Sequence, residues 1–122
     1  MIADDVLAFI RASIRSVWSL ELLVLMQSDS GTPWRTDRLV RELRASASVI
    51  AAGLAELGAA GLVADEGGGL YRFRPRTERL AELTARLVAA YSEMPMTVTN
   101  AILSAPNDKI QTFADAFLFK KK

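Results

Sequence analysis

The sequence predicts a mainly α-helical fold with a small β-hairpin, and three observations support this prediction. Apolar residues recur at three- and four-residue spacing along most of the chain, as they do in amphipathic helices. Two short runs with branched or aromatic residues flank Gly67-Gly68-Gly69, a pattern typical of a hairpin with a glycine turn. Of the 122 residues, 51% are hydrophobic and 24% are charged, which is the composition of a folded globular protein.

The N-terminal segment, residues 3–27, is predicted to be helical, because nothing breaks its apolar spacing before Ser28. Ser13 or Ser16 is able to cap a second helix, so one long helix and two helices with a bend both remain open. The half from residue 17 onward is apolar on most of its circumference and is expected at the centre of the fold. The apolar residues that define the segment are Val6, Leu7, Ile10, Ile14, Val17 and Trp18.

A short helix over 37–44 is predicted after a loop that contains Pro33 and Trp34. Thr36 is expected to cap this helix, since its hydroxyl can accept a hydrogen bond from a free backbone N–H of the first turn. Trp18 and Trp34 are both expected to pack in the core, which is the usual place for large aromatic side chains.

The next helix is expected to begin at Ser46 or Ser48 and to end at Gly58 or Gly61. Its inward face is predicted to carry three residues spaced four and three apart, namely Ile50, Leu54 and Leu57. About three residues join this helix to the preceding one, the length that is typical of a helix-turn-helix.

A β-hairpin is predicted next, with strands over 62–66 and 70–74. Aromatic residues alternate with arginines along the second strand, so the two kinds of side chain point to opposite faces. They are Tyr71 and Phe73 on one face, and Arg72 and Arg74 on the other. Three helices followed by a hairpin form a winged helix-turn-helix, which is therefore the predicted fold class, with further C-terminal helices.

Beyond the hairpin, Thr77 is expected to cap a helix that runs to about residue 91, and a weaker helix is expected over 96–104 after Pro95. The predicted organisation is therefore a winged helix-turn-helix over 1–76 and a helical extension over 77–122.

A last helix is predicted over 107–119, and its apolar stripe has little reason to be exposed to water. The stripe consists of Ile110, Phe113 and Phe117. It is expected to fold back on the domain, to pair with a second subunit, or to dock a partner protein. We favour a homodimer interface among these three.

The composition argues against an enzyme. The chain has no cysteine and no histidine, which removes the thiolate nucleophile, the usual general base and the commonest metal ligands. A carboxylate-only metal site or a catalytic carboxylate pair remains open in principle, but the adjacent pairs Asp4-Asp5 and Asp65-Glu66 are expected to be solvated surface acids. We expect no catalytic residue, no metal and no cofactor. No signal peptide or membrane span is apparent, so a cytoplasmic protein without membrane contact is expected.

The stretch 48–63, SVIAAGLAELGAAGLV, resembles the recognition helix and the beginning of the wing in MarR-type and PadR-type bacterial transcription regulators. The resemblance implies a dimer that inserts the 46–57 helix into the major groove of DNA and lays its wing on the backbone. This sequence departs from the MarR pattern at two positions. It has Ala52 where an arginine is usual and Glu56 where a polar or basic residue is usual, so base readout by an arginine is not expected.

Phosphate contacts are expected instead from arginines that recur every three residues before the recognition helix, and from the wing. The alternative is that nearby acidic residues neutralise several of these arginines, namely Asp37, Glu42, Asp65 and Glu66. The candidate DNA-binding residues are Arg35, Arg38, Arg41, Arg44, Ser46, Ser48, Ala51, Ala52, Arg72 and Arg74.

The sequence therefore predicts a homodimeric regulator of transcription that binds double-stranded DNA. The alternative is a winged-helix adaptor that binds a partner protein without sequence-specific DNA binding, because the recognition helix is rich in alanine and the net charge is only +1. A ligand pocket of the MarR kind, between the DNA-binding part and the dimerisation helices, would use Trp34, Tyr71 or Tyr91.

Overall fold

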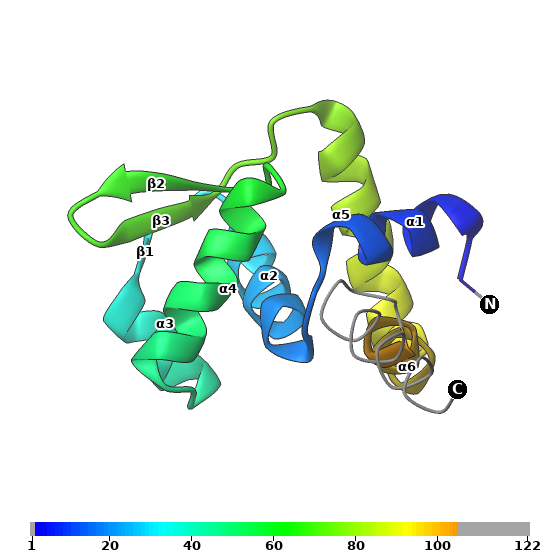
Figure 1. Cartoon of the computed structure of the whole chain (residues 1–122). Helices are drawn as coiled ribbons and strands as arrows, with labels where there is room; N and C mark the ends of the chain where they lie inside the picture. Colours follow the sequence, from blue (N-terminus) through cyan, green and yellow to red (C-terminus); the bar gives the residue numbers. More distant parts are fainter. Residues whose placement is uncertain (1, 105–122) are drawn as a thin grey trace, which may run out of the picture.

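The computed structural model describes residues 2–104, which form six helices and one three-stranded antiparallel sheet (Figure 1). The helices are α1 (Asp4–Ser13), α2 (Val17–Ser28), α3 (Thr36–Leu43), α4 (Ala47–Ala59), α5 (Glu78–Glu93) and α6 (Pro95–Ser104). The strands are β1 (Trp34–Arg35), β2 (Val63–Gly67) and β3 (Leu70–Phe73). The mainly helical fold with a small β-wing is confirmed. The predicted stripe of Ile110, Phe113 and Phe117 lies outside the described residues.

The N-terminal segment consists of two helices, which settles the alternative that the sequence left open. Ile14 leaves the helical conformation, with φ −109° and ψ 103°. The Ser16 hydroxyl then accepts a hydrogen bond of 3.1 Å from the backbone N–H of Ser19 and so caps α2. Because the helix is interrupted, the four-residue spacing between Ile14 and Trp18 no longer places them on one face. The expectation that Trp18 packs in the core is wrong, since 44% of this residue is exposed.

The wing is a hairpin of β2 and β3, with Val63 opposite Phe73. Its turn needs glycine, because Gly68 and Gly69 have φ angles of 64° and 78°. The loop expected around Trp34 is wrong in part. Trp34 and the following residue form β1, which pairs with β3 and adds a third strand to the sheet.

Thr36 does not cap α3 as expected. It is the first residue of the helix, and its backbone N–H donates to the Gly69 carbonyl in the wing turn at 3.1 Å. This bond ties the beginning of α3 to the turn of the wing, so α3 and the wing hold each other in place.

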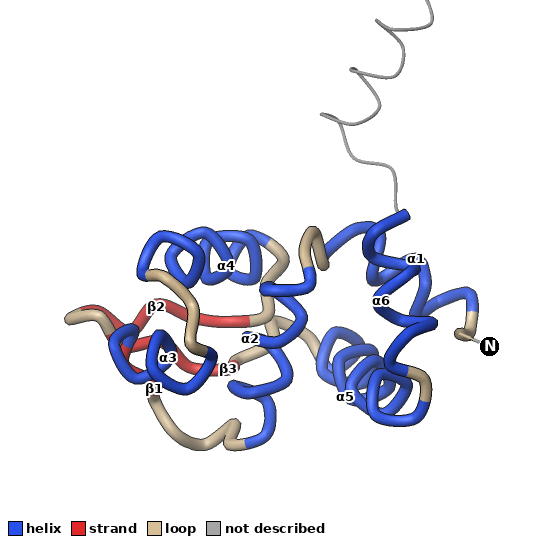
Figure 2. Tube along the Cα trace, turned by 90° about the horizontal axis from the view of Figure 1, so that it is seen from below, coloured by secondary structure: helices blue, strands red, loops and turns tan. Residues whose placement is uncertain are grey.

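The helices divide into two groups on either side of α2 (Figure 2). Helices α3 and α4 lie with the sheet on one side, and α1, α5 and α6 pack together on the other. The apolar core runs through both groups without a break and includes Ile10, Leu20, Leu57 and Leu87, all of which are fully buried. Trp34 is 3% exposed, so its expected place in the core is confirmed.

Polar contacts join α5 to the N-terminal helices. Asp5 on α1 accepts hydrogen bonds from Arg86 at 2.5 and 2.9 Å and from Arg79 at 2.9 Å. The hydrogen bonds from Arg86 and Arg79 lower the pKa of Asp5 to about 2. The Tyr91 hydroxyl donates to Glu21 on α2, and this bond together with burial raises the pKa of Tyr91 to about 12.

Candidate nucleic-acid interface

Helices α3 and α4 form a helix-turn-helix whose connection is Arg44, Ala45 and Ser46, in agreement with the predicted three residues. Arg44 ends α3 in the left-handed conformation, with φ 54° and ψ 40°, and its N–H donates to the Val40 carbonyl. The Ser46 hydroxyl accepts a hydrogen bond of 3.2 Å from the Val49 N–H and caps α4. The turn therefore has a fixed backbone path that orients α4 relative to α3.

Helix α4 packs with one face and presents the other to solvent. Its buried residues are Ile50, Gly53, Leu54 and Leu57. Its exposed residues are Ala47, Ser48, Ala51, Ala52, Ala55 and Ala59. The one charged residue of α4, Glu56, is half-buried and accepts a hydrogen bond from the buried Ser19 hydroxyl on α2. The solvent face of α4 thus has small side chains and no charge.

Close packing against α2 holds α4 in this orientation. Gly53 lies so near α2 that a Cβ atom at this position would be 3.0 Å from Leu22 Cδ2. Any larger residue here would require the buried Leu22 side chain to shift, so Gly53 serves the close approach of α4 to α2.

The arginines that precede α4 are available for intermolecular contacts. Arg35, Arg38, Arg41 and Arg44 are exposed, and none of them forms an ion pair within residues 2–104. The neighbouring acidic residues on α3 therefore do not neutralise them by direct pairing. The Arg38 guanidinium lies over the Trp34 ring, 4.3 Å from its centroid, which fixes one of these cations beside β1.

The two wing arginines differ from each other. Arg72 is half-buried, its Nε lies 3.2 Å from both carboxylate oxygens of Glu66, and it donates to the Gly31 carbonyl at 2.8 Å. Its guanidinium thus links the wing to the loop after α2. Arg74 is exposed and forms no ion pair in the described part of the chain. Of the two, Arg74 is the better placed to reach a phosphate.

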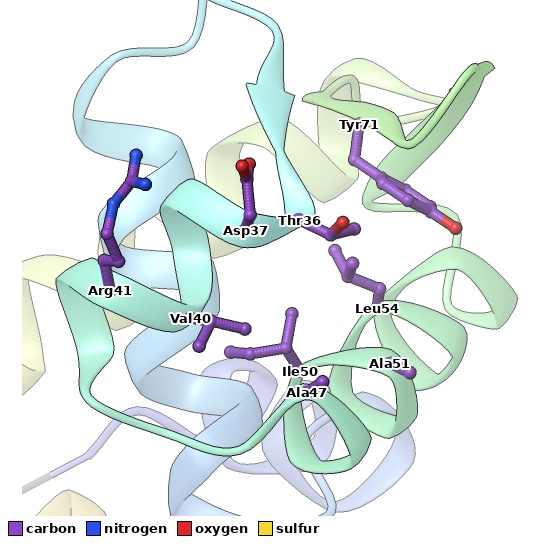
Figure 3. Close-up of a pocket in the computed structure, with 9 residues that line it drawn as sticks. All are labelled: Thr36, Asp37, Val40, Arg41, Ala47, Ile50, Ala51, Leu54 and Tyr71. Atoms are coloured by element: carbon purple, nitrogen blue, oxygen red, sulfur yellow. The ribbon is translucent and has the colours of Figure 1, made fainter.

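A pocket of about 620 Å³ opens between α3, α4 and β3 (Figure 3). Its lining residues are Thr36, Asp37, Val40, Arg41, Ala47, Ile50, Ala51, Leu54 and Tyr71. It brings together one predicted DNA-binding arginine, Arg41, and one predicted helix position, Ala51. Sequence reasoning missed this pocket. The alanines at positions 47 and 51, one turn apart on α4, were the available signal, since small side chains leave space between packed elements.

The comparisons with known proteins give no family assignment. No protein-family model matches the chain, and neither a curated protein nor a solved structure matches it. Within residues 2–104, no helix has the length and hydropathy needed to cross a membrane. Nor do three or more metal-binding side chains gather in this part of the chain.

Proposed function

We propose that this protein is a transcription regulator that docks its helix-turn-helix on double-stranded DNA and holds the duplex chiefly through phosphate contacts. The observation that supports the proposal is the set of exposed arginines without ion pairs on α3 and in the turn, directly before an uncharged α4. In a helix-turn-helix, the helix before the recognition helix crosses the DNA backbone, so Arg41 and Arg44 would contact phosphates there.

In this proposal α4 lies in the major groove and contributes little charge. Its alanine methyl groups, such as those of Ala51 and Ala52, are suited to contact with thymine methyl groups, and Ser48 can donate or accept one hydrogen bond. No arginine on α4 is available for the bidentate contact with guanine. The regulator is therefore expected to bind many sequences with modest discrimination, and Arg74 would add a phosphate contact from the wing.

Dimerisation is a separate part of the proposal. A homodimer would read two half-sites, and its expected contacts are the apolar residues of segment 107–119, which lies outside the described residues. Phosphate binding by a single helix-turn-helix does not depend on it.

A second candidate function is a protein-interaction adaptor. The uncharged face of α4 and the largely apolar pocket beside it favour this reading, because protein interfaces have apolar centres. Selection of genomic DNA fragments by the full-length chain at low and at high salt separates the two functions. A regulator retains fragments at low salt and releases most of them at high salt. Failure to retain any fragment at low salt would contradict DNA binding and favour the adaptor.

A further inference from the structure

The pocket between α3, α4 and β3 has the size and the construction of a small-molecule site. Its volume of about 620 Å³ lies within the range of about 300–1,000 Å³ that is typical of ligand pockets. Three separate elements form its walls, and the bond from the Thr36 N–H to the Gly69 carbonyl ties α3 to the wing turn directly before β3. The space is therefore a feature of the folded domain and does not depend on one mobile side chain.

The chemistry of the pocket suits an uncharged ligand. Val40, Ile50 and Leu54 point toward one another across the space, whereas the charged groups of Asp37 and Arg41 extend away from these three residues (Figure 3). The remaining walls are small or aromatic. A charged ligand would lose part of its hydration against these apolar side chains, and neither charged group points in among them to compensate.

Two of the uncharged residues that line the pocket carry a hydroxyl group. The side chains of Thr36 and Tyr71 both line it, and neither hydroxyl forms a hydrogen bond to another residue among residues 2–104. Each of them can donate or accept one to a ligand. An apolar cavity with a few polar groups that fix orientation is the usual form of a small-molecule site.

We propose that this pocket binds a small, uncharged, mainly aromatic or alicyclic molecule with one hydrogen-bonding group, and that the bound molecule competes with DNA. Ala47 and Ala51 line the pocket and also belong to the exposed face of α4. A ligand in contact with these two alanines would lie on the face of α4 that has to enter the major groove, and it would keep the DNA away. The binding site stands on the pocket alone, whereas the competition rests on the proposed function.

The chain offers a matched pair of variants. Ala51 and Ala52 are adjacent exposed alanines on α4, and Ala51 lines the pocket whereas Ala52 does not. Phenylalanine at position 51 should fill the opening, and phenylalanine at position 52 adds the same ring outside it. Both positions face solvent, so both variants are expected to keep the fold, which their amide NMR spectra check directly.

The test is an amide NMR titration of the full chain with three uncharged probes, naphthol, indole and cyclohexanol. Saturable shifts of Val40, Ile50 and Leu54 are expected with at least one probe. The Ala51→Phe variant should raise its dissociation constant about tenfold or more, and Ala52→Phe should leave it within about twofold. The site is overturned if none of the probes produces saturable shifts, or if Ala51→Phe binds as tightly as the wild type.

DNA competition is measured separately by titrating a fluorescent duplex with wild-type protein that is saturated with the bound probe. A weaker DNA affinity supports competition, and an unchanged affinity overturns it while the binding site stands. If the wild type binds no DNA at all, the proposed function fails, and the NMR titration alone decides whether the site exists.

Discussion

Replacement of Arg44 by glycine should stabilise the protein while weakening its binding to DNA. Arg44 adopts φ 54° and ψ 40° at the end of α3, and it is the one non-glycine residue among residues 2–104 with a positive φ. The left-handed conformation costs a residue with a Cβ atom about 1–2 kcal/mol. Glycine avoids this cost but loses about 0.5–1 kcal/mol more conformational free energy on folding. The expected net gain in the free energy of unfolding is therefore about 0–1.5 kcal/mol, with a middle value of about 0.75 kcal/mol.

The assay is urea denaturation of the wild type, Arg44→Gly and Arg44→Ala, with the slope of the transition checked for constancy. Alanine removes the guanidinium but keeps the backbone strain, so Arg44→Ala should change the free energy of unfolding by less than about 0.5 kcal/mol. Both variants should lose DNA affinity to a similar degree, because both lack the cation.

Two results would refute this reasoning. If Arg44→Gly is less stable than Arg44→Ala, the left-handed backbone at this position is not under strain. If Arg44→Gly loses much more DNA affinity than Arg44→Ala, loss of the cation does not account for the whole effect, and the stiffness of the turn contributes to binding.

Three further predictions concern packing, acid stability and the proposed groove contact. Gly53→Val should lower the free energy of unfolding by about 1–3 kcal/mol, because even a Cβ atom there would press on α2, and an unchanged urea midpoint would contradict the close approach. The lowered pKa of Asp5, about 2 against an ordinary 3.8, stabilises the fold above about pH 4, and this contribution is lost as the pH falls toward 2. Asp5→Asn should therefore have a lower free energy of unfolding than the wild type at neutral pH and should lose less of it between about pH 4 and 2, as measured by urea unfolding at each pH. If the free energies of the two proteins fall in parallel with pH, the stabilising role of Asp5 is contradicted. Ala52→Arg should tighten binding to all duplexes in a fluorescence titration, whereas Ala89→Arg, which adds the same charge on the exposed side of α5, should not.

Local patterns in the sequence predict much of this fold. The spacing of Ile50, Leu54 and Leu57 predicted the buried face of α4. Residues three and four apart lie on the same face of a helix, so this prediction depends only on neighbouring residues in the sequence. The position of β1 was not predictable in this way, since Trp34 becomes a strand residue only by pairing with Tyr71, far along the chain. Trp18 was misplaced because its spacing from Ile14 assumed a continuous helix.

The candidate site was predictable to a smaller extent. The three-residue recurrence of the α3 arginines indicated exposed cations, and their exposure follows from the amphipathic helix. The different surroundings of Arg72 were not predictable, because its partner carbonyl comes from Gly31 in a distant loop. The pocket was not predictable from the sequence either, since it depends on how α3, α4 and β3 pack against one another.

The most direct test of phosphate anchoring is the salt dependence of DNA affinity for the wild type and for the Arg41→Ala/Arg44→Ala double variant. Each phosphate contact contributes about 0.9 to the slope of log affinity against log salt, so losing two should flatten the slope by about 1.8. Arg11→Ala, which removes an exposed arginine from α1 on the other side of α2, serves as the control and should keep the wild-type slope. A double variant whose slope equals that of the wild type would contradict the proposal that these two arginines hold the DNA backbone.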